Sequence, residues 1–242
     1  MKILITNDDG VFAPALPRLI RWARKYGEVI AVAPKVEQSG KSHAIDFMHP
    51  QEIKQVEIAP DIIAWSMDST PADCVRFALD QLGRDFDLII SGINRGYNLG
   101  GDIVYSGTVG AIFEGIRQGI PGIALSGYPT THIEAIDHLD RVFDFIHANG
   151  LLSLNPLYNV NVPPEAGEIR ITKQGGIYFT DRFVPIGDDL YVQEGEPDIG
   201  DLSDPSIDIA AVHSGYISIT PLSASRTELG VFAKLRALDS VN

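Results

Sequence analysis

The stretch MKILITNDDG, residues 1–10, decides the fold of this chain. Its apolar run from Ile3 to Thr6 is typical of a fully buried strand in a parallel sheet. Asp8 and Asp9 follow where such a strand ends, and ligands of open α/β sheets bind just outside the carboxyl ends of the strands. Two adjacent carboxylates repel each other unless a cation lies between them. The stretch therefore indicates either a divalent-metal site or an ordinary turn, since Asn, Asp and Gly are also the commonest turn residues.

Strand-like and helix-like segments alternate through the first 150 residues, as in a doubly wound, mostly parallel α/β sheet. Thr70-Pro71 predicts the start of one helix, because threonine is a good N-cap and proline suits the first helical position. The other helices are expected over 13–26, from about 107, and over 133–146. The expected strands are 2–6, 28–33, 51–58, 62–65, 86–90 and 121–125, with a possible hairpin around Pro60-Asp61.

The pattern changes after about residue 155, where short strands alternate with proline and glycine turns. We predict a Rossmann-like catalytic core over residues 1–155. Residues 156–242 are predicted to supply a β-rich hairpin extension, a strand that returns to the core, and a C-terminal segment for oligomerisation. The expected elements of this second part are strands at 157–162, 169–173, 177–183, 190–193 and 216–221, and helices at 204–212 and 224–238.

Composition excludes several classes of protein. The formal charge of −13 over 242 residues argues against a nucleic-acid duplex as partner, because such proteins carry a basic face. No apolar run approaches the ~20 residues needed to span a membrane, so no membrane partner is expected. The strand-like N-terminus lacks a signal-peptide pattern. Cys74 is the only cysteine, so no intrachain disulfide can form, which fits a cytoplasmic protein.

Two further loops carry oxygen donors at predicted strand ends. Ser39 follows the second strand, and Asn94 follows the strand at 86–90. Together with Asp8 and Asp9 they offer four oxygen ligands without sulfur or imidazole, a set that suits Mg²⁺ or Mn²⁺ rather than zinc. Taken singly, each residue also has a plain turn interpretation.

A phosphate site is predicted where the helix near residue 107 begins. Ser106, Gly107 and Thr108 place backbone N–H groups and the positive end of a helix dipole at this point. Ser106 or Thr108 alone could equally be an ordinary N-cap. A metal beside an anion cradle at strand ends indicates phosphoester chemistry.

The motifs resemble those of the SurE family of stationary-phase survival proteins, which are metal-dependent nucleoside monophosphate phosphatases. The resemblance spans nearly the whole chain, in order. It rests on NDDG at 7–10, SG at 39–40, TPADCV at 70–75, SGINRGYN at 91–98, YSGTVGA at 105–111 and GYISITPL at 215–222.

The resemblance implies one divalent metal per subunit, Mg²⁺ or Mn²⁺, on Asp8, Asp9, Ser39 and Asn94. It also implies a Rossmann-like core, an interlocked C-terminal region, and a homodimer or homotetramer. The implied activity is that of a 5′-nucleotidase, with 3′-nucleotides and short polyphosphate as further possible substrates. We assign catalysis to Asp8 and Asp9. The predicted phosphate and substrate contacts are Asn7, Arg95, Asn98, Ser106, Gly107 and Thr108.

The stretch 179–191 departs from the usual extension of the family, which leaves the oligomer contacts and substrate preference near it open. Two mechanisms fit the carboxylates: attack by a metal-activated water, or attack by Asp8 to give an aspartyl-phosphate. We favour water, because the second mechanism usually has an Asp two residues after the nucleophile, and residue 10 is Gly. A nucleotide sensor without turnover and a glycan-handling enzyme are the alternatives.

Three residues with reactive or charged side chains need a separate interpretation. His43 could donate a proton to the leaving oxygen, but a solvated loop histidine is the simpler interpretation. Arg95 is equally suited to phosphate contact and to an ordinary surface position. Cys74 lies on an apolar helical face and is predicted to be a buried side chain without nucleophilic function. The preferred base, the physiological substrate and the number of subunits cannot be inferred from these residues.

Overall fold

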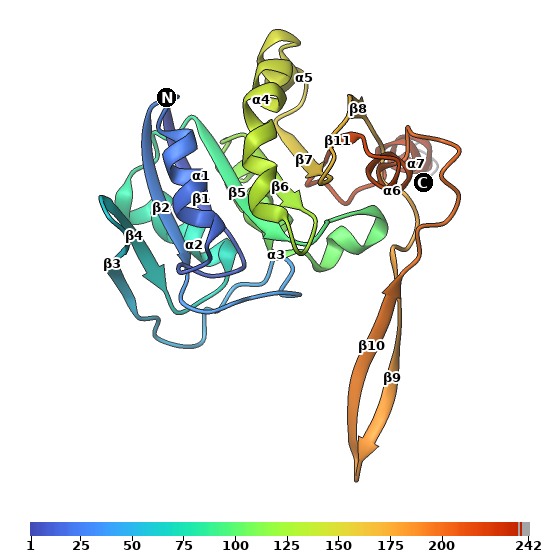
Figure 1. The fold of residues 1–242 in the computed structure, drawn as a ribbon, viewed down its shortest axis with the longest axis horizontal. Helices are drawn as coiled ribbons and strands as arrows, with labels where there is room; N and C mark the ends of the chain where they lie inside the picture. The colour runs from blue at the N-terminus through green and yellow to red at the C-terminus, as the bar shows by residue number, and fades with distance from the viewer. Residues whose placement is uncertain (237, 239–242) are drawn as a thin grey trace.

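The computed structural model describes residues 1–236 and 238. Within this part of the chain, nine strands form one sheet in the order β3-β4-β2-β1-β5-β6-β7-β11-β8, and β9 and β10 form a separate hairpin (Figure 1). The strands are β1 (Lys2–Thr6), β2 (Glu28–Pro34), β3 (Ile53–Ala59), β4 (Ile62–Met67), β5 (Leu88–Arg95), β6 (Gly122–Gly127), β7 (Leu157–Val162), β8 (Ile169–Ile171), β9 (Phe179–Gly187), β10 (Leu190–Pro197) and β11 (Ile217–Pro221).

The helices connect these strands in the alternating order that the sequence predicts. The α-helices are α1 (Ala15–Ala23), α2 (Pro71–Phe77), α3 (Gly107–Ile116), α4 (Leu139–Ala148), α5 (Leu151–Leu154), α6 (Asp208–His213) and α7 (Leu229–Leu235). Shorter helical turns of other types are η1 (Ala78–Leu82), η2 (Gly100–Tyr105) and η3 (His132–His138).

The sheet is mostly parallel, as predicted. The pairs β4-β2, β2-β1, β1-β5, β5-β6, β6-β7 and β11-β8 are parallel. Antiparallel pairing is confined to the hairpin β3-β4, which turns at the predicted Pro60-Asp61, and to β11-β7. The strands of residues 157–171 and 217–221 therefore continue the same sheet as the first 127 residues.

Helices cover both faces of the sheet, because the side chains of each buried strand alternate between two cores. Ile3 and Ile5 of β1 face the core made with α1 and α4. Leu4 lies on the opposite face, in the core made with α2 and α3. In Figure 1, α1 and α4 cross in front of the strands while α2 and α3 lie behind them. This alternation explains why strands buried on both faces have nearly continuous apolar sequences.

Several boundaries differ from the predictions: the helix expected at 204–212 is Asp208–His213, and the strands expected at 177–183 and 190–193 are Phe179–Gly187 and Leu190–Pro197. Two further differences lie next to the proposed site. The strand expected to end at Ile90 continues as β5 to Arg95, with a shift of its pairing with β6 between Ser91 and Asn94. The single helix expected over 133–146 is split into the 3₁₀ turn η3 and α4. Both errors concern irregular backbone next to the proposed site, where periodicity carries no signal.

The β9-β10 hairpin stands away from the sheet, at the end of the molecule that also holds α6 and α7 (Figure 1). Phe183, Ile186 and Leu190 of the hairpin and Phe232 and Leu235 of α7 are exposed. The helix predicted over 224–238 is confirmed in part: α7 covers Leu229–Leu235, and residues 224–228 are not helical. Residues 237 and 239–242 of the predicted C-terminal segment lie outside the described residues. Among the described residues, no helix has the length and apolar character needed to cross a membrane.

Candidate active site

The loop after β1 buries the first of the two predicted carboxylates. Both polar atoms of the Asn7 side chain bond to Gly10: Nδ2 donates to its carbonyl at 3.0 Å, and Oδ1 accepts from its amide at 3.1 Å. Gly10 has a φ of 102°, in the region that favours glycine. The resulting tight turn holds the Asp8 side chain at 4% exposure and leaves Asp9 half-buried.

Two hydrogen bonds bring the other predicted segments to this loop. The amide of Gln38, next to Ser39, donates to the carbonyl of Asp8 at 2.7 Å. The amide of Arg95, next to Asn94, donates to Asp9 Oδ2 at 3.1 Å. The residues next to Ser39 and Asn94, the two proposed neutral ligands, thus contact the Asp8-Asp9 turn. Both ligands are far from that turn in the sequence.

Glu37 adds a third carboxylate that sequence reasoning missed. Ser39 Oγ donates to Glu37 Oε1 at 2.8 Å, and Arg95 Nη2 lies 3.5 Å from Glu37 Oε2. A hydroxyl that donates to a carboxylate keeps its oxygen lone pairs for a cation. The only sequence signal for Glu37 was its position two residues before Ser39, in a loop where an exposed acidic residue is common.

Burial, together with the charge of Asp9, raises the pKa of Asp8 to about 6 against the opposing hydrogen bond from Thr108. Burial also raises the pKa of Asp9, against the Arg95 amide and the charges of His132 and Arg95. Within residues 1–236 and 238, no basic side chain forms an ion pair with Asp8. A bound cation would neutralise this buried charge and lower both pKa values.

The donor chemistry fits a hard divalent cation. Two carboxylates, one hydroxyl and one carboxamide offer only oxygen, and Mg²⁺ and Mn²⁺ are held by few protein oxygens together with water and substrate. The described residues contain no group of three or more His, Cys, Asp or Glu placed to hold a metal. The proposed ligand set contains only two residues of these types, Asp8 and Asp9, because Ser39 and Asn94 are neutral oxygen donors.

The start of α3 packs directly on Asp8. A Cβ at Gly107 would lie 3.1 Å from Asp8 Cβ and 3.3 Å from Asp8 Oδ2, so the close approach requires glycine. Ser106 is the N-cap, and its Oγ accepts from the amide of Val109 at 3.1 Å. The amide of Thr108 faces Asp8 and lowers its pKa, so the Gly107 amide is the first-turn donor that remains for an anion.

Several predicted substrate contacts already have protein partners. Thr108 Oγ1 donates to Asp8 Oδ1 at 2.6 Å and is fully buried, so its hydroxyl supports the carboxylate rather than an open phosphate cradle. The side chain of Asn7 shapes the turn, and that of Arg95 pairs with Glu37. Asn98 Nδ2 donates to Ser126 Oγ at 2.7 Å and retains a second N–H. Asn98 and the Gly107 amide are therefore the better candidates for phosphate contact.

His43 lies in a buried ion-pair network instead of standing free in solvent. Its Nε2 is 2.8 Å from Oε2 of Glu114, which α3 buries. Burial would raise the pKa of Glu114, but the His43 hydrogen bond and the charges of His43, Arg76 and Arg117 hold it below its usual value. The geometry ties His43 to the middle of α3 and indicates that it anchors the loop that follows Ser39.

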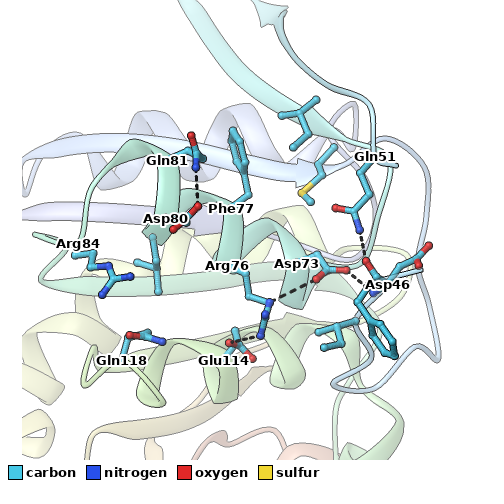
Figure 2. Close-up of a pocket in the computed structure, with 15 residues that line it drawn as sticks. Asp46, Gln51, Asp73, Arg76, Phe77, Asp80, Gln81, Arg84, Glu114 and Gln118 are labelled. Atoms are coloured by element: carbon cyan, nitrogen blue, oxygen red, sulfur yellow. Dashed lines mark hydrogen bonds and ion pairs between the residues drawn. The ribbon is translucent and has the colours of Figure 1, made fainter. Parts of the chain in front are cut away.

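Figure 2 shows the second part of this anchorage, between α2 and α3. Arg76 reaches Glu114 Oε1 at 3.3 Å, and Asp73 accepts from the amide of Asp46 at 2.7 Å. The same residues line a cavity of about 640 Å³ on the flank of α2. Neither Asp8 nor Asp9 lines this cavity. We therefore interpret it as a space left where the loop is attached to α2 and α3, and not as part of the candidate site.

Cys74 lies in α2 and is buried. Burial raises its pKa well above the usual value, so the thiol stays protonated near neutral pH. The structure agrees with the prediction that this residue is a core side chain.

Comparisons of the sequence and the fold with known proteins all match this chain to proteins of a single family. The family model described as survival protein SurE matches residues 3–181. A protein of Vibrio cholerae named 5′-nucleotidase SurE is 37% identical over 249 residues, which cover 99% of this chain and 96% of that protein. A protein of Acinetobacter baumannii with the same name is 38% identical over 262 residues, covering 98% and 99%. The crystal structure of the SurE protein from Aquifex aeolicus has a TM-score of 0.81 at 32% identity and covers 99% of this chain and 100% of that one.

Proposed function

Because the chain belongs to the survival protein SurE family, we propose that it is a divalent-metal-dependent phosphatase that hydrolyses nucleoside 5′-monophosphates to nucleoside and phosphate. The observation that carries the proposal is the buried Asp8-Asp9 pair beside the first turn of α3. Acidic oxygen donors and free backbone amides are the two kinds of group that a metal-assisted reaction of a phosphate ester needs.

We assign the metal to Asp8, Asp9, Ser39 and Asn94, one Mg²⁺ or Mn²⁺ per subunit. When bound, the cation supplies charge neutralisation at the phosphate and lowers the pKa of a water. The chain itself orients the groups: Thr108 and Gly107 fix Asp8, and the Arg95 amide fixes Asp9. The Gly107 amide and the remaining N–H of Asn98 bind the phosphate oxygens.

The proposed division of the chain follows from where these residues lie. Residues 1–155 carry every proposed metal and phosphate contact. Residues 156–242 contain the hairpin and α7, whose exposed apolar side chains support a homodimer or homotetramer. The single cysteine, which cannot form an intrachain disulfide, supports a cytoplasmic location.

The test is phosphate release from a substrate panel by metal-reconstituted protein. AMP and GMP are expected to be hydrolysed, with 3′-AMP and tripolyphosphate measuring the breadth of specificity. A p-nitrophenyl glycoside tests the glycan alternative. Binding of AMP without phosphate release would contradict an enzymatic function and favour a nucleotide sensor.

A further inference from the structure

Strand β7 buries two asparagines in the middle of an otherwise apolar core. Its sequence is LYNVNV, and both Asn159 and Asn161 are 0% exposed. They are two residues apart, so both side chains point to the same face of the sheet. Burial of a carboxamide is costly unless it is hydrogen-bonded, so these positions demand specific partners.

The partner of both side chains is the backbone of Asn98. Asn159 Nδ2 and Asn161 Nδ2 donate to the Asn98 carbonyl at 2.8 and 2.9 Å. Asn161 Oδ1 accepts from the Asn98 amide at 2.9 Å. The side chain of Asn161 thus bonds to both the backbone N–H and the backbone C=O of Asn98, as the backbone of a neighbouring strand would.

The side chain of Asn98 is held from the adjacent strand. Ser126, on β6 and in register with Asn161, accepts from Asn98 Nδ2 at 2.7 Å. Asn98 is therefore fixed by residues from β6 and β7, and its second Nδ2 proton remains available.

The metal-ligand segment is held by different contacts. Asn94 Nδ2 donates to the carbonyl of Gly96 at 2.8 Å, and the neighbouring Arg95 amide bonds to Asp9. Asn94 pairs through its backbone with Ser126 of β6, and the next residue contacts Asp9. The side chains of Ser126, Asn159 and Asn161 contact Asn98 and none of the four proposed metal ligands.

We infer that Asn161, with Asn159 and Ser126, positions Asn98 for contact with the phosphate of the substrate, through side-chain contacts that the metal ligands do not share. The inference rests on the proposed function and adds three positioning residues to it. These residues act through Asn98 and do not themselves touch substrate.

The neighbours of Asn161 provide a matched pair of variants. Ser126 and Ser218 lie in register with Asn161 on its two sides, and both are 0% exposed. Ser126 bonds to Asn98, whereas Ser218 bonds only to Thr172, at 2.7 Å, among the described residues. Ser126→Ala and Ser218→Ala therefore remove the same hydroxyl from the same buried row, and only the first removes a contact to Asn98.

The experiment measures phosphate and metal binding separately in the full chain. Ser126→Ala should raise the KM for AMP and the Kd for inorganic phosphate by roughly three- to tenfold, the loss expected for one hydrogen bond. Asn161→Leu removes two hydrogen bonds to Asn98 and should raise both constants at least as much. The Kd for Mn²⁺, measured by calorimetry without substrate, should not change. Ser218→Ala should match the wild type in all three measurements. Ser126→Ala alone decides the result if Asn161→Leu does not fold.

Two results would overturn the inference: equal behaviour of Ser126→Ala and Ser218→Ala, or a parallel loss of Mn²⁺ affinity. Absence of phosphate binding by the wild type would overturn it as well. Failure of the proposed function has a different signature, because the wild type would then bind phosphate and Mn²⁺ without hydrolysing AMP.

Discussion

Asp8 is buried beside a second carboxylate and receives a hydrogen bond from Thr108 at 2.6 Å. Thr108→Ala should lower the affinity for Mn²⁺ by roughly tenfold, because a hydrogen bond to a charged group contributes about 1.5 kcal/mol or more. Thr108→Ser keeps the hydroxyl and should restore most of the affinity. Calorimetric titration of the metal-free protein measures both variants.

The control for this prediction is Ser106→Ala. It removes the N-cap bond to Val109 and should cost about 1 kcal/mol of stability. It leaves the Asp8 contact intact, so its Mn²⁺ affinity should be unchanged. Equal metal affinity in Thr108→Ala and wild type would show that Asp8 does not depend on this contact.

The pH dependence of metal-free stability tests the burial of the Asp8 charge. The folded pKa of about 6 lies above the usual aspartate value of 3.8, so the folded state favours the neutral acid. Its contribution to stability is fully present below about pH 4 and is lost as the pH rises through 6. Asp8→Asn should therefore stabilise the metal-free protein at pH 7.5 by about 1–3 kcal/mol, and by little at pH 4.

Urea denaturation of both proteins at the two pH values, with a chelator present, measures this difference. The comparison within one pH cancels the titration of the shared groups that do not interact with Asp8. Equal stabilities at pH 7.5 would indicate that the Asp8 charge is already compensated in the metal-free fold.

At the scale of secondary structure, α3 depends on a close approach to the loop that follows Ser39. A Cβ at Gly110 would lie 2.4 Å from the carbonyl oxygen of Ser42. Gly110→Ala should push this backbone away, cost about 1–3 kcal/mol of stability, and weaken Mn²⁺ binding through Ser39. Gly176→Ala is the control, since a Cβ there meets no atom within 4 Å.

Urea midpoints and Mn²⁺ titrations check this prediction together. A Gly110→Ala protein that loses stability but keeps full metal affinity would show that the loop moves without disturbing Ser39. A loss in both measurements, absent from Gly176→Ala, is the expected result.

The parallel strands and the helices that cross them could be predicted from sequence because each buries a regular apolar pattern. Leu88 to Ile90 and Ile3 to Ile5 are recognisable without any tertiary information. The extension of β5 to Arg95 and the 3₁₀ turn η3 could not be predicted, since tertiary contacts with Asp9 and β6 determine them.

The candidate site divides in the same way. Asp8, Asp9, Ser39 and Asn94 were proposed from residue type and motif position alone. Glu37, Glu114 and Asn161 were missed because their partners lie on other elements, and residue type does not show which loop a buried polar group will contact. The alternating asparagines of β7 were the one available signal for Asn161, since amides are unusual in so apolar a strand.

At the scale of the whole molecule, the exposed apolar residues gather on the hairpin and α7. Leu229, Phe232 and Leu235 are more than half exposed on α7, at 66%, 52% and 55%. Truncation before Ser223, or Phe232→Asp in the full chain, should lower the oligomer mass measured by light scattering, because the apolar stripe would lose its partner surface. Lys234→Ala is the full-chain control, and it should leave the mass unchanged. Wild-type mass in both altered proteins would mean that α7 packs within its own subunit.

The most direct test of the central claim is AMP hydrolysis by metal-stripped protein titrated with Mn²⁺. We predict no phosphate release in EDTA, recovery that saturates near one Mn²⁺ per subunit, and a loss of at least ~100-fold in kcat for Asp8→Asn. Full turnover by protein shown to be metal-free by elemental analysis, or normal turnover by Asp8→Asn at low Mn²⁺, would contradict the assignment of this site.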